Sequence, residues 1–422
     1  MYVEIFNELV EIMHKDYAGC LDKKGWDQPE LYRGKIKELR EDALLTRGKF
    51  TELVKDYLLD FKDPHMAFKE LGKEPSEKSS VGFKVRRYGD KLYVTGLNGE
   101  ERLTLGDAII SLDRVPVLSL VEKHTRELME DIAEREDWTN IITQYSEAEV
   151  MDKSGSLRLV KIHSYPAEAY LPTYSLEEIE DGTLLLTLTD FANPDEISGL
   201  IRSKEGELSE AVNLIIDVRV NYGGSDAAFF EILPYLFAEE PDVQAFLDHY
   251  AMEFNCTDRN AELTIKRMKE QLSATKDEQF RQMLQGLIAK WEENRGKGFL
   301  SFGEPRVMFP AGKINPQNIV VLTDVTCGSS GDIFAYVCKM SPKVRVIGRP
   351  TAGLNDYSNL TKMEWAEFEF WYPTSRLKQI DARDKDFTHG VKPHQYIPWT
   401  PEHIDRDLDM EAALRLLKEN GL

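Results

Sequence analysis

The chain has 422 residues, and its 74 acidic side chains against 53 basic ones give a formal net charge of −21. One hydrophobic core rarely serves so long a chain, so we expect roughly two or three domains, and the apolar content of 42% is that of a soluble globular protein. Nucleic acids and anionic membranes would be repelled by this charge, which argues against both as partners.

The cysteines and the N-terminus exclude further classes. The 4 cysteines, Cys20, Cys256, Cys327 and Cys338, have neither a CxxC pair nor zinc-ligand spacing, and no glycine-rich nucleotide loop is present. We therefore expect no disulfide framework, no metal and no other cofactor. The opening stretch mixes acids with apolar residues and predicts an amphipathic helix, not a signal peptide, and no apolar run could span a bilayer. We expect a cytoplasmic protein without a membrane partner.

Residues 1–77 are expected to form an N-terminal helical domain. Their amphipathic segments are Val3–Tyr17, Pro29–Leu45 and Lys49–Leu59. His65 follows Asp63-Pro64, where the proline should end the helix and leave the imidazole on a loop. A loop histidine has the solvent access that a proton shuttle needs, although an ordinary surface histidine has the same setting.

Residues 78–122 have a β-rich pattern that resembles a PDZ domain. Val81-Gly82-Phe83 stands at the place of the carboxylate-binding loop, and Leu105–Val117 matches the strand-turn-strand of that domain. A PDZ domain binds an extended peptide C-terminus by strand addition. A small β-barrel that only packs against the rest of the chain is the alternative.

Residues 123–422 alternate between strand and helix patterns, which predicts an α/β catalytic core. The elements we expect before the insertion are a helix at Val121–Arg135, strands at Leu157–Ile162, Thr183–Leu188 and 213–218, and a helix at Pro194–Ile201. The stretch Asn213–Gly224 opens with a largely apolar run, as in a buried parallel strand, and ends at Gly223-Gly224, where a ligand can approach the backbone closely. A plain strand-to-helix turn would also use such glycines.

A highly charged stretch at about 241–298 predicts a helical insertion in this core. Its apolar residues recur at helical spacing, which would suit a lid, a contact in a homo-oligomer or a purely structural addition. After the insertion we expect a strand near 319–322, a helix, a strand at Val344–Ile347, a strand at Glu364–Tyr372 and a final helix at Met410–Glu419.

The turn between the strand near 319–322 and the following helix carries Ser329 and Ser330. A hydroxyl at the positive end of a helix, beside unpaired backbone N–H groups, suits a nucleophile whose attack creates an oxyanion. Ser329 and Asp332 also have capping-box spacing, which is a purely structural alternative.

Four motifs together resemble the C-terminal processing peptidase family, which includes tail-specific, tricorn-like and interphotoreceptor retinoid-binding protein-like serine peptidases. In chain order they are DPHM at Asp63–Met66, LGDAIISLD at Leu105–Asp113, LIIDVRVNYGG at Leu214–Gly224, and TCGSSGDIF at Thr326–Phe334 with GRPTAGLNDY at Gly348–Tyr357. The resemblance implies an α/β multidomain fold with a crotonase/ClpP-like layered catalytic core, an inserted PDZ-like β domain and an N-terminal helical domain.

The resemblance also implies a serine peptidase that forms an acyl-enzyme and cleaves peptides or unfolded proteins, recognised through their C-terminus. It assigns Ser329 as the nucleophile and His65 as the general base. The backbone N–H groups of Gly223 and Ser330 fall at the oxyanion hole, and Asp386 is the candidate acid.

The chain departs from the family at several positions. Leu354 stands where the Ser-Lys branch has its lysine, and Pro64 stands where the tricorn-like branch has a serine before the histidine. Tyr222 replaces a glycine, which leaves the choice between Gly223 and Gly224 open. A catalytically decayed binding protein for peptide C-termini or apolar ligands is therefore the second interpretation. Acyl-CoA chemistry, known from crotonase-type cores, is a third, against which the PDZ-like segment argues.

Overall fold

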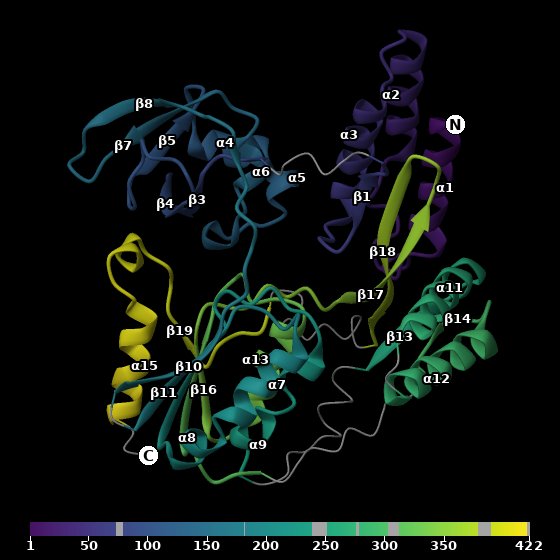
Figure 1. Ribbon diagram of the computed structural model, residues 1–422. Coiled ribbons are helices and arrows are strands. Elements are labelled where there is room, and N and C mark those ends of the chain that lie inside the picture. The colour runs from purple at the N-terminus through teal and green to yellow at the C-terminus, as the bar shows by residue number, and fades with distance from the viewer. Residues whose placement is uncertain are drawn as a thin grey trace. The chain divides into compact units, whose positions relative to one another are not determined.

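The computed structural model describes residues 1–72, 79–180, 182–238, 251–275, 278–302, 312–378 and 390–419 (Figure 1). The chain divides into two compact units. The first comprises Met1–Glu74, Val243–Val307 and Leu354–Thr388, and the second comprises Pro75–Asp242, Met308–Gly353 and His389–Leu422. Each unit is therefore assembled from segments that are distant in the sequence.

The first unit combines the N-terminal helices with an antiparallel sheet. The helices are α1 (Tyr2–Lys15), α2 (Pro29–Glu41) and α3 (Arg47–Leu58), close to the segments expected from their periodicity. The sheet has the order β1–β18–β13–β14, with β17 paired to β18. Its strands are β1 (Ala67–Glu70), β13 (Met252–Cys256), β14 (Gly298–Leu300), β17 (Tyr357–Glu364) and β18 (Phe368–Leu377). Helices and sheet share one buried core that includes Phe50, Phe68 and Phe368.

The charged stretch forms helices α11 (Asp258–Ala274) and α12 (Glu278–Asn294) between β13 and β14. Trp291 and Ile265 are buried in the core that these helices share with Cys256 of β13. The flanking strands were not predicted, because strands of 5 and 3 residues give too short a pattern to recognise.

The β-rich part of the second unit is an antiparallel sheet of order β3–β4–β5–β7–β8, with β6 paired to β5. Its strands are β3 (Phe83–Tyr88), β4 (Lys91–Leu97), β5 (Ala108–Leu112), β6 (Val115–Pro116), β7 (Glu147–Met151) and β8 (Leu157–Lys161). Helices α4 (Val117–Lys123), α5 (Thr125–Leu128) and α6 (Thr139–Ile142) contribute Leu120, Leu128 and Ile141 to its core. A separate pair joins β2 (Ser79–Ser80) to β9 (Tyr165–Pro166).

The helix expected at Val121–Arg135 is wrong in its extent. The structure begins a helix at Val117, interrupts it at His124 and ends it at Met129, whose φ of 55° is left-handed. A residue in that conformation cannot continue a right-handed helix. The chain then forms a separate short helix, η2 (Ala133–Arg135).

The core of the second unit contains a sheet of order β10–β11–β12–β15–β16–β19. Its strands are β10 (Tyr174–Glu180), β11 (Thr183–Leu188), β12 (Asn213–Asp217), β15 (Asn318–Thr323), β16 (Val344–Gly348) and β19 (Gln395–Tyr396). All neighbours are parallel except β10, which runs antiparallel at the edge. Figure 1 shows helices α7 (Pro194–Ser203), α8 (Glu205–Glu210), α9 (Leu233–Leu236) and α13 (Ser330–Met340) on one side of this sheet and α15 (Leu408–Glu419) on the other. The α/β multidomain fold is thus confirmed.

Burial on both faces explains the continuous apolar runs of β12 and β15. Ile215 and Val320 pack against Ala413 and Leu417 of α15, and the alternate side chains face the opposite layer. Each such buried aliphatic side chain stabilises the fold by about 1.5–3 kcal/mol relative to exposure. Because parallel strands end at the same edge, the loops after β12 and β15 meet there.

The single strand expected at Glu364–Tyr372 is wrong, because this range covers the end of β17, the connection at residues 365–367 and the first half of β18. Strands β17 and β18 pair from Tyr357↔Arg376 to Glu364↔Glu369. In β17 only Tyr357 and Thr361 are buried, and the residues between them are mostly polar, so the sequence shows no apolar alternation there. Within the described ranges, no helix has both the length and the apolar character needed to cross a membrane.

Candidate active site

Two loops at the carboxyl edge of the core sheet are bonded to each other. The N–H of Gly328 donates to the carbonyl of Asn221 at 3.0 Å. The hydroxyl of Ser330 donates to the carbonyl of Gly224, also at 3.0 Å. The turn that carries Ser329 is therefore held directly against the glycine loop that follows β12.

Ser329 has an unusual backbone conformation. Its φ is 58° and its ψ is −120°, at the N-cap of α13. Thr46 and Thr257, which also cap helices, have the ordinary extended φ of −96° and −67°. A left-handed residue that is not glycine costs roughly 1–3 kcal/mol, and such strain is concentrated at functional sites. A strained serine on a strand-to-helix turn is the arrangement of a nucleophile elbow, which exposes the hydroxyl above the sheet.

Ser329 and Asp332 also form the capping box that their spacing predicts. The N–H of Ser329 donates to one carboxylate oxygen of the fully buried Asp332 at 2.8 Å, and the N–H of Gly353 donates to the other at 2.8 Å. The structural and the catalytic interpretations of Ser329 are therefore compatible. The cap fixes the strained turn and ties it to the loop at residues 351–353.

Gly223 lies against the Ser329 side chain. A Cβ atom at Gly223 would be 2.7 Å from Cβ and 3.3 Å from Oγ of Ser329, and the φ of Gly223 is 74°. Its N–H donates to the side-chain oxygen of Asn221 at 2.9 Å. The N–H groups of Gly224 and Ser330 have no hydrogen-bond partner among the described residues. Ser330 and one of the two glycines thus place backbone donors around the Ser329 turn.

A third loop supports the same turn. The N–H of Ala352 donates to the carbonyl of Cys327 at 2.7 Å. The guanidinium of Arg135, whose side chain is 6% exposed, donates to the carbonyls of Thr351 and Ala352 at 2.8 Å each. No sequence signal could have indicated Arg135, because its partners are backbone carbonyls far away in the chain.

The cysteine beside the turn is not a competing nucleophile. Cys327 is buried, and this burial together with nearby carboxylates raises the pKa of its thiol well above the ordinary value. A buried neutral thiol is inert compared with a thiolate. Ser329 therefore remains the candidate nucleophile of this turn.

An ion network anchors the start of the turn. Asp324, the first residue after β15, accepts two hydrogen bonds from Arg86 of β3 at 2.7 and 2.8 Å and one from Arg349 at 2.8 Å. Arg349 also donates twice to the buried Asp409 at 2.7 Å. Burial by itself would raise the pKa of Asp324, but the two guanidinium groups outweigh it and hold the pKa well below its ordinary value. Beside these ions lies a cavity of about 450 Å³.

His65 lies in the first unit, on the turn after Asp63-Pro64 that the sequence predicts. Its backbone N–H donates to the Asp63 carboxylate at 3.0 Å, and its Nδ1 is 3.8 Å from the same oxygen. The structure thus brings Ser329, Ser330 and Gly223 together in the second unit and His65 to Asp63 in the first. Asp386 lies outside the described residues. The Asp63 contact was not predicted, although Asp63 belongs to the DPHM motif.

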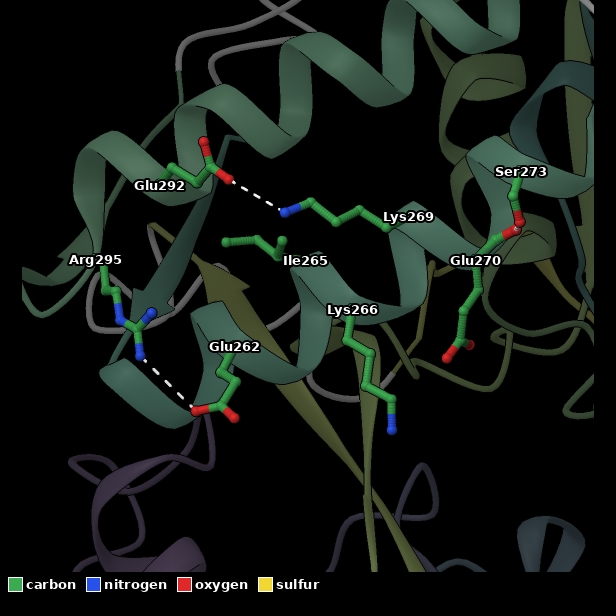
Figure 2. Close-up of a pocket in the computed structure, with 8 residues that line it drawn as sticks. All are labelled: Glu262, Ile265, Lys266, Lys269, Glu270, Ser273, Glu292 and Arg295. Atoms are coloured by element: carbon green, nitrogen blue, oxygen red, sulfur yellow. Dashed lines mark hydrogen bonds and ion pairs between the residues drawn. The ribbon is translucent and has the colours of Figure 1, made fainter.

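The first unit has a large surface pocket that is unrelated to these residues (Figure 2). Its volume is about 780 Å³, and it lies between α11 and α12. Figure 2 shows the ion pairs Lys269–Glu292 at 3.5 Å and Arg295–Glu262 at 3.8 Å along its walls. Of the described candidate residues, neither His65 nor those of the Ser329 turn and the glycine loop line it, so the volume of a pocket does not locate the chemistry here.

A model of peptidase family S41 matches residues 182–397, which is more than half of the chain and includes the Gly223 loop and the Ser329 turn. The chain belongs to peptidase family S41. The protein is therefore a serine-type peptidase, and the predicted kinship with C-terminal processing peptidases is confirmed.

Several solved structures are similar to this S41 peptidase. Mature CPAF in its complex with lactacystin has a TM-score of 0.63 at 14% identity, covering 98% of this chain and 97% of that chain. A point mutant of CPAF has a TM-score of 0.64 at 14% identity, covering 99% and 97%. A photosystem II C-terminal processing protease has 0.47 at 14% identity, covering 95% and 94%. The similarity to CPAF shows a common fold. No curated protein sequence matches the chain significantly.

Proposed function

We propose that this S41 peptidase cleaves peptide bonds through an acyl-enzyme on Ser329, with His65 as the general base. The observation that carries the proposal is the left-handed backbone of Ser329 on a turn that is bonded to the glycine loop. Family membership supports serine chemistry, and the Ser329 turn is the part of the matched range with the geometry of a nucleophile elbow.

In the proposed reaction, the imidazole of His65 takes the hydroxyl proton of Ser329 while Oγ attacks the scissile carbonyl carbon. The C–N bond breaks as the imidazolium gives this proton to the leaving amine. A water molecule, deprotonated by His65, then attacks the ester and releases the acid product. The mechanism requires the imidazole to come within hydrogen-bond reach of Oγ.

The developing oxyanion would be held by the N–H of Ser330 and by the N–H of Gly223 or Gly224. Gly223 lies nearest to Ser329, whereas the N–H of Gly224 has no partner in the described part of the chain. Removing one donor of an oxyanion hole costs about 3 kcal/mol of transition-state stabilisation. Phe387 holds the family position of the acid, and its neighbour Asp386 is the acid that we propose from the sequence.

We propose peptides or unfolded proteins as substrates, recognised through their C-terminus by the PDZ-like part. The proposal is supported by strand β3, which lies at the edge of the PDZ-like sheet and begins directly after Gly82, whose φ is 79°. A sheet edge of this kind can accept a further strand.

The boundaries at 77/78 and 122/123 stay predictions, and β7 and β8 extend the PDZ-like sheet beyond residue 122. The cytoplasmic location and the homo-oligomer also stay predictions from the sequence.

The test is hydrolysis of denatured casein by the wild-type chain and by Ser329→Ala, together with fluorophosphonate labelling. We expect the label on Ser329 and a fall in turnover of roughly 10³-fold or more in the variant. Equal turnover in both proteins would overturn the proposal. A native protein that is neither labelled nor active, and that binds peptide C-termini, would establish the binding-protein alternative.

A further inference from the structure

His65 has a carboxylate of its own turn beside it. In the ranges that the structure describes, Asp63 is the acid within ion-pairing distance of the imidazole, with 3.8 Å between its Oδ1 and Nδ1 of His65. The same oxygen accepts the backbone N–H of His65 at 3.0 Å. The Asp63 side chain is 3% exposed and the His65 side chain 19% exposed. The carboxylate is thus buried while the ring keeps access to solvent.

The second oxygen of this carboxylate is also fixed. Oδ2 of Asp63 accepts the hydroxyl of Tyr17 at 2.7 Å, and Tyr17 is fully buried. Burial and the Asp63 charge raise the pKa of Tyr17, so the phenol stays a neutral donor. The buried Lys23, whose ammonium donates to the carbonyl of Phe61 at 2.7 Å, supplies a positive charge nearby. Asp22 and Asp356 are the other charged groups that act on Lys23.

We infer that Asp63 is the residue that positions His65 for catalysis. Its carboxylate holds the backbone of the Pro64–His65 turn and faces Nδ1, which leaves the other ring nitrogen for Ser329. The negative charge stabilises the imidazolium that forms when Ser329 loses its proton. The inference rests on the proposed function.

The geometry fits this role in an enzyme without substrate. A separation of 3.8 Å is ion-pairing distance and not a hydrogen bond, and catalytic hydrogen bonds often tighten only when substrate is bound. Acid and base come from one turn, two residues apart, and the distant Tyr17 fixes the second oxygen of the acid. Asp386 would then be dispensable for orienting His65.

A purely structural role is the competing explanation, and the chain contains a matched control for it. Asp27 accepts a hydrogen bond from Tyr57 at 2.6 Å and contacts Nε2 of His14 at 2.8 Å, in the same unit. Its carboxylate is buried like that of Asp63, while His14 is 45% exposed and lies at the end of α1. Both acids join a buried tyrosine to a histidine, but only Asp63 belongs to the DPHM motif.

The experiment compares Asp63→Asn with Asp27→Asn in the full chain. Asparagine at position 63 keeps an oxygen that can accept the His65 N–H, removes the charge, and places an NH2 group where Oδ2 accepts the Tyr17 hydroxyl. We expect kcat to fall by roughly 10²–10⁴-fold with KM little changed. The acid limb of the pH profile of kcat/KM should move to lower pH, because the imidazolium has lost its partner. Asp27→Asn should change neither kcat nor the profile.

The outcomes separate this inference from the proposed function. If His65→Ala is as inactive as Ser329→Ala while Asp63→Asn keeps the wild-type kcat and pH profile, the role of Asp63 is overturned and the proposed function stands. If Ser329→Ala keeps full turnover, both fail. Should Asp63→Asn not fold, Asp63→Glu decides, because it keeps the charge and displaces it. For Asp63→Glu, a lower kcat with an unchanged acid limb in the pH profile of kcat/KM supports the positioning role of Asp63. An unchanged kcat overturns that role.

Discussion

Gly223 and the side chain of Ser329 are in direct contact, so that a methyl group at Gly223 would lie 2.7 Å from Cβ of Ser329. This distance is too short for two carbon atoms, and the φ of 74° at Gly223 disfavours any other residue. The glycine loop is therefore built to approach the serine, whichever of its N–H groups binds the oxyanion.

Gly223→Ala should consequently impair both stability and turnover. We expect the free energy of unfolding to fall by about 1–3 kcal/mol, because strain at a left-handed residue adds to the clash. Urea denaturation and casein hydrolysis measure the two effects. Gly199→Ala is the control, since Gly199 lies in α7 with open space around it and should gain about 0.5–1 kcal/mol. Equal behaviour of the two variants would contradict the contact.

The strain at Ser329 makes a separate prediction about two inactive variants. Glycine tolerates a φ of 58°, whereas alanine does not. Ser329→Gly should therefore be more stable than Ser329→Ala, by about 1 kcal/mol more than glycine exceeds alanine at an N-cap with an ordinary φ, such as Thr46. Thermal unfolding of both variants tests this. A more stable alanine variant would show that the backbone there is not strained.

The Asp324 network predicts a dependence of stability on pH. The pKa of Asp324 is lower in the folded chain than its ordinary value of 3.8, so its stabilisation is complete above that value and is lost as the pH falls toward the folded pKa. Asp324→Asn should be clearly less stable than the wild type at pH 7, and this difference should shrink below about pH 4. Denaturation at a series of pH values measures it. A difference independent of pH would mean that the carboxylate charge does not stabilise the fold.

Arg135 is predicted to affect the reactivity of Ser329 without touching substrate. Its two bonds to the loop at residues 351–353 are relayed through Ala352 to Cys327. The Arg135→Lys variant keeps the positive charge but loses the planar guanidinium that donates both hydrogen bonds. We therefore expect fluorophosphonate labelling of Ser329 to slow by roughly tenfold. Arg158→Lys is the control, because Arg158 pairs with Asp107 in the same unit at 2.5 Å and touches neither loop. Equal labelling rates in both variants would show that Arg135 does not support the Ser329 turn.

The local parts of the site could be predicted from the sequence. The structure contains the apolar runs of β12 and β15, the small residues of the Ser329 turn and the apolar stripe of α13. Each of these patterns involves only residues that are close together in the sequence. The capping box follows from spacing alone. These features needed no knowledge of which segments meet in space.

The non-local parts could not be predicted in the same way. In the first unit, β1 pairs with β18 through Ala67↔Trp371, which joins opposite ends of the chain, and neither strand carries a sign of its partner. The Arg135 and Asp63 contacts depend on backbone carbonyls and on turn geometry, which residue types do not reveal. Pairing of this kind is decided by burial and register across the whole fold.

The central claim is that Ser329 is acylated with the help of His65, and the most direct measurement is the acyl-enzyme itself. A slow ester substrate is mixed with the wild type and with His65→Ala, the reaction is quenched in acid, and the modified peptide is identified by mass spectrometry. We predict an acyl group on Ser329 in the wild type, formed roughly 10³-fold more slowly in the variant. An acyl group on another residue, or equal rates in the two proteins, would contradict the account.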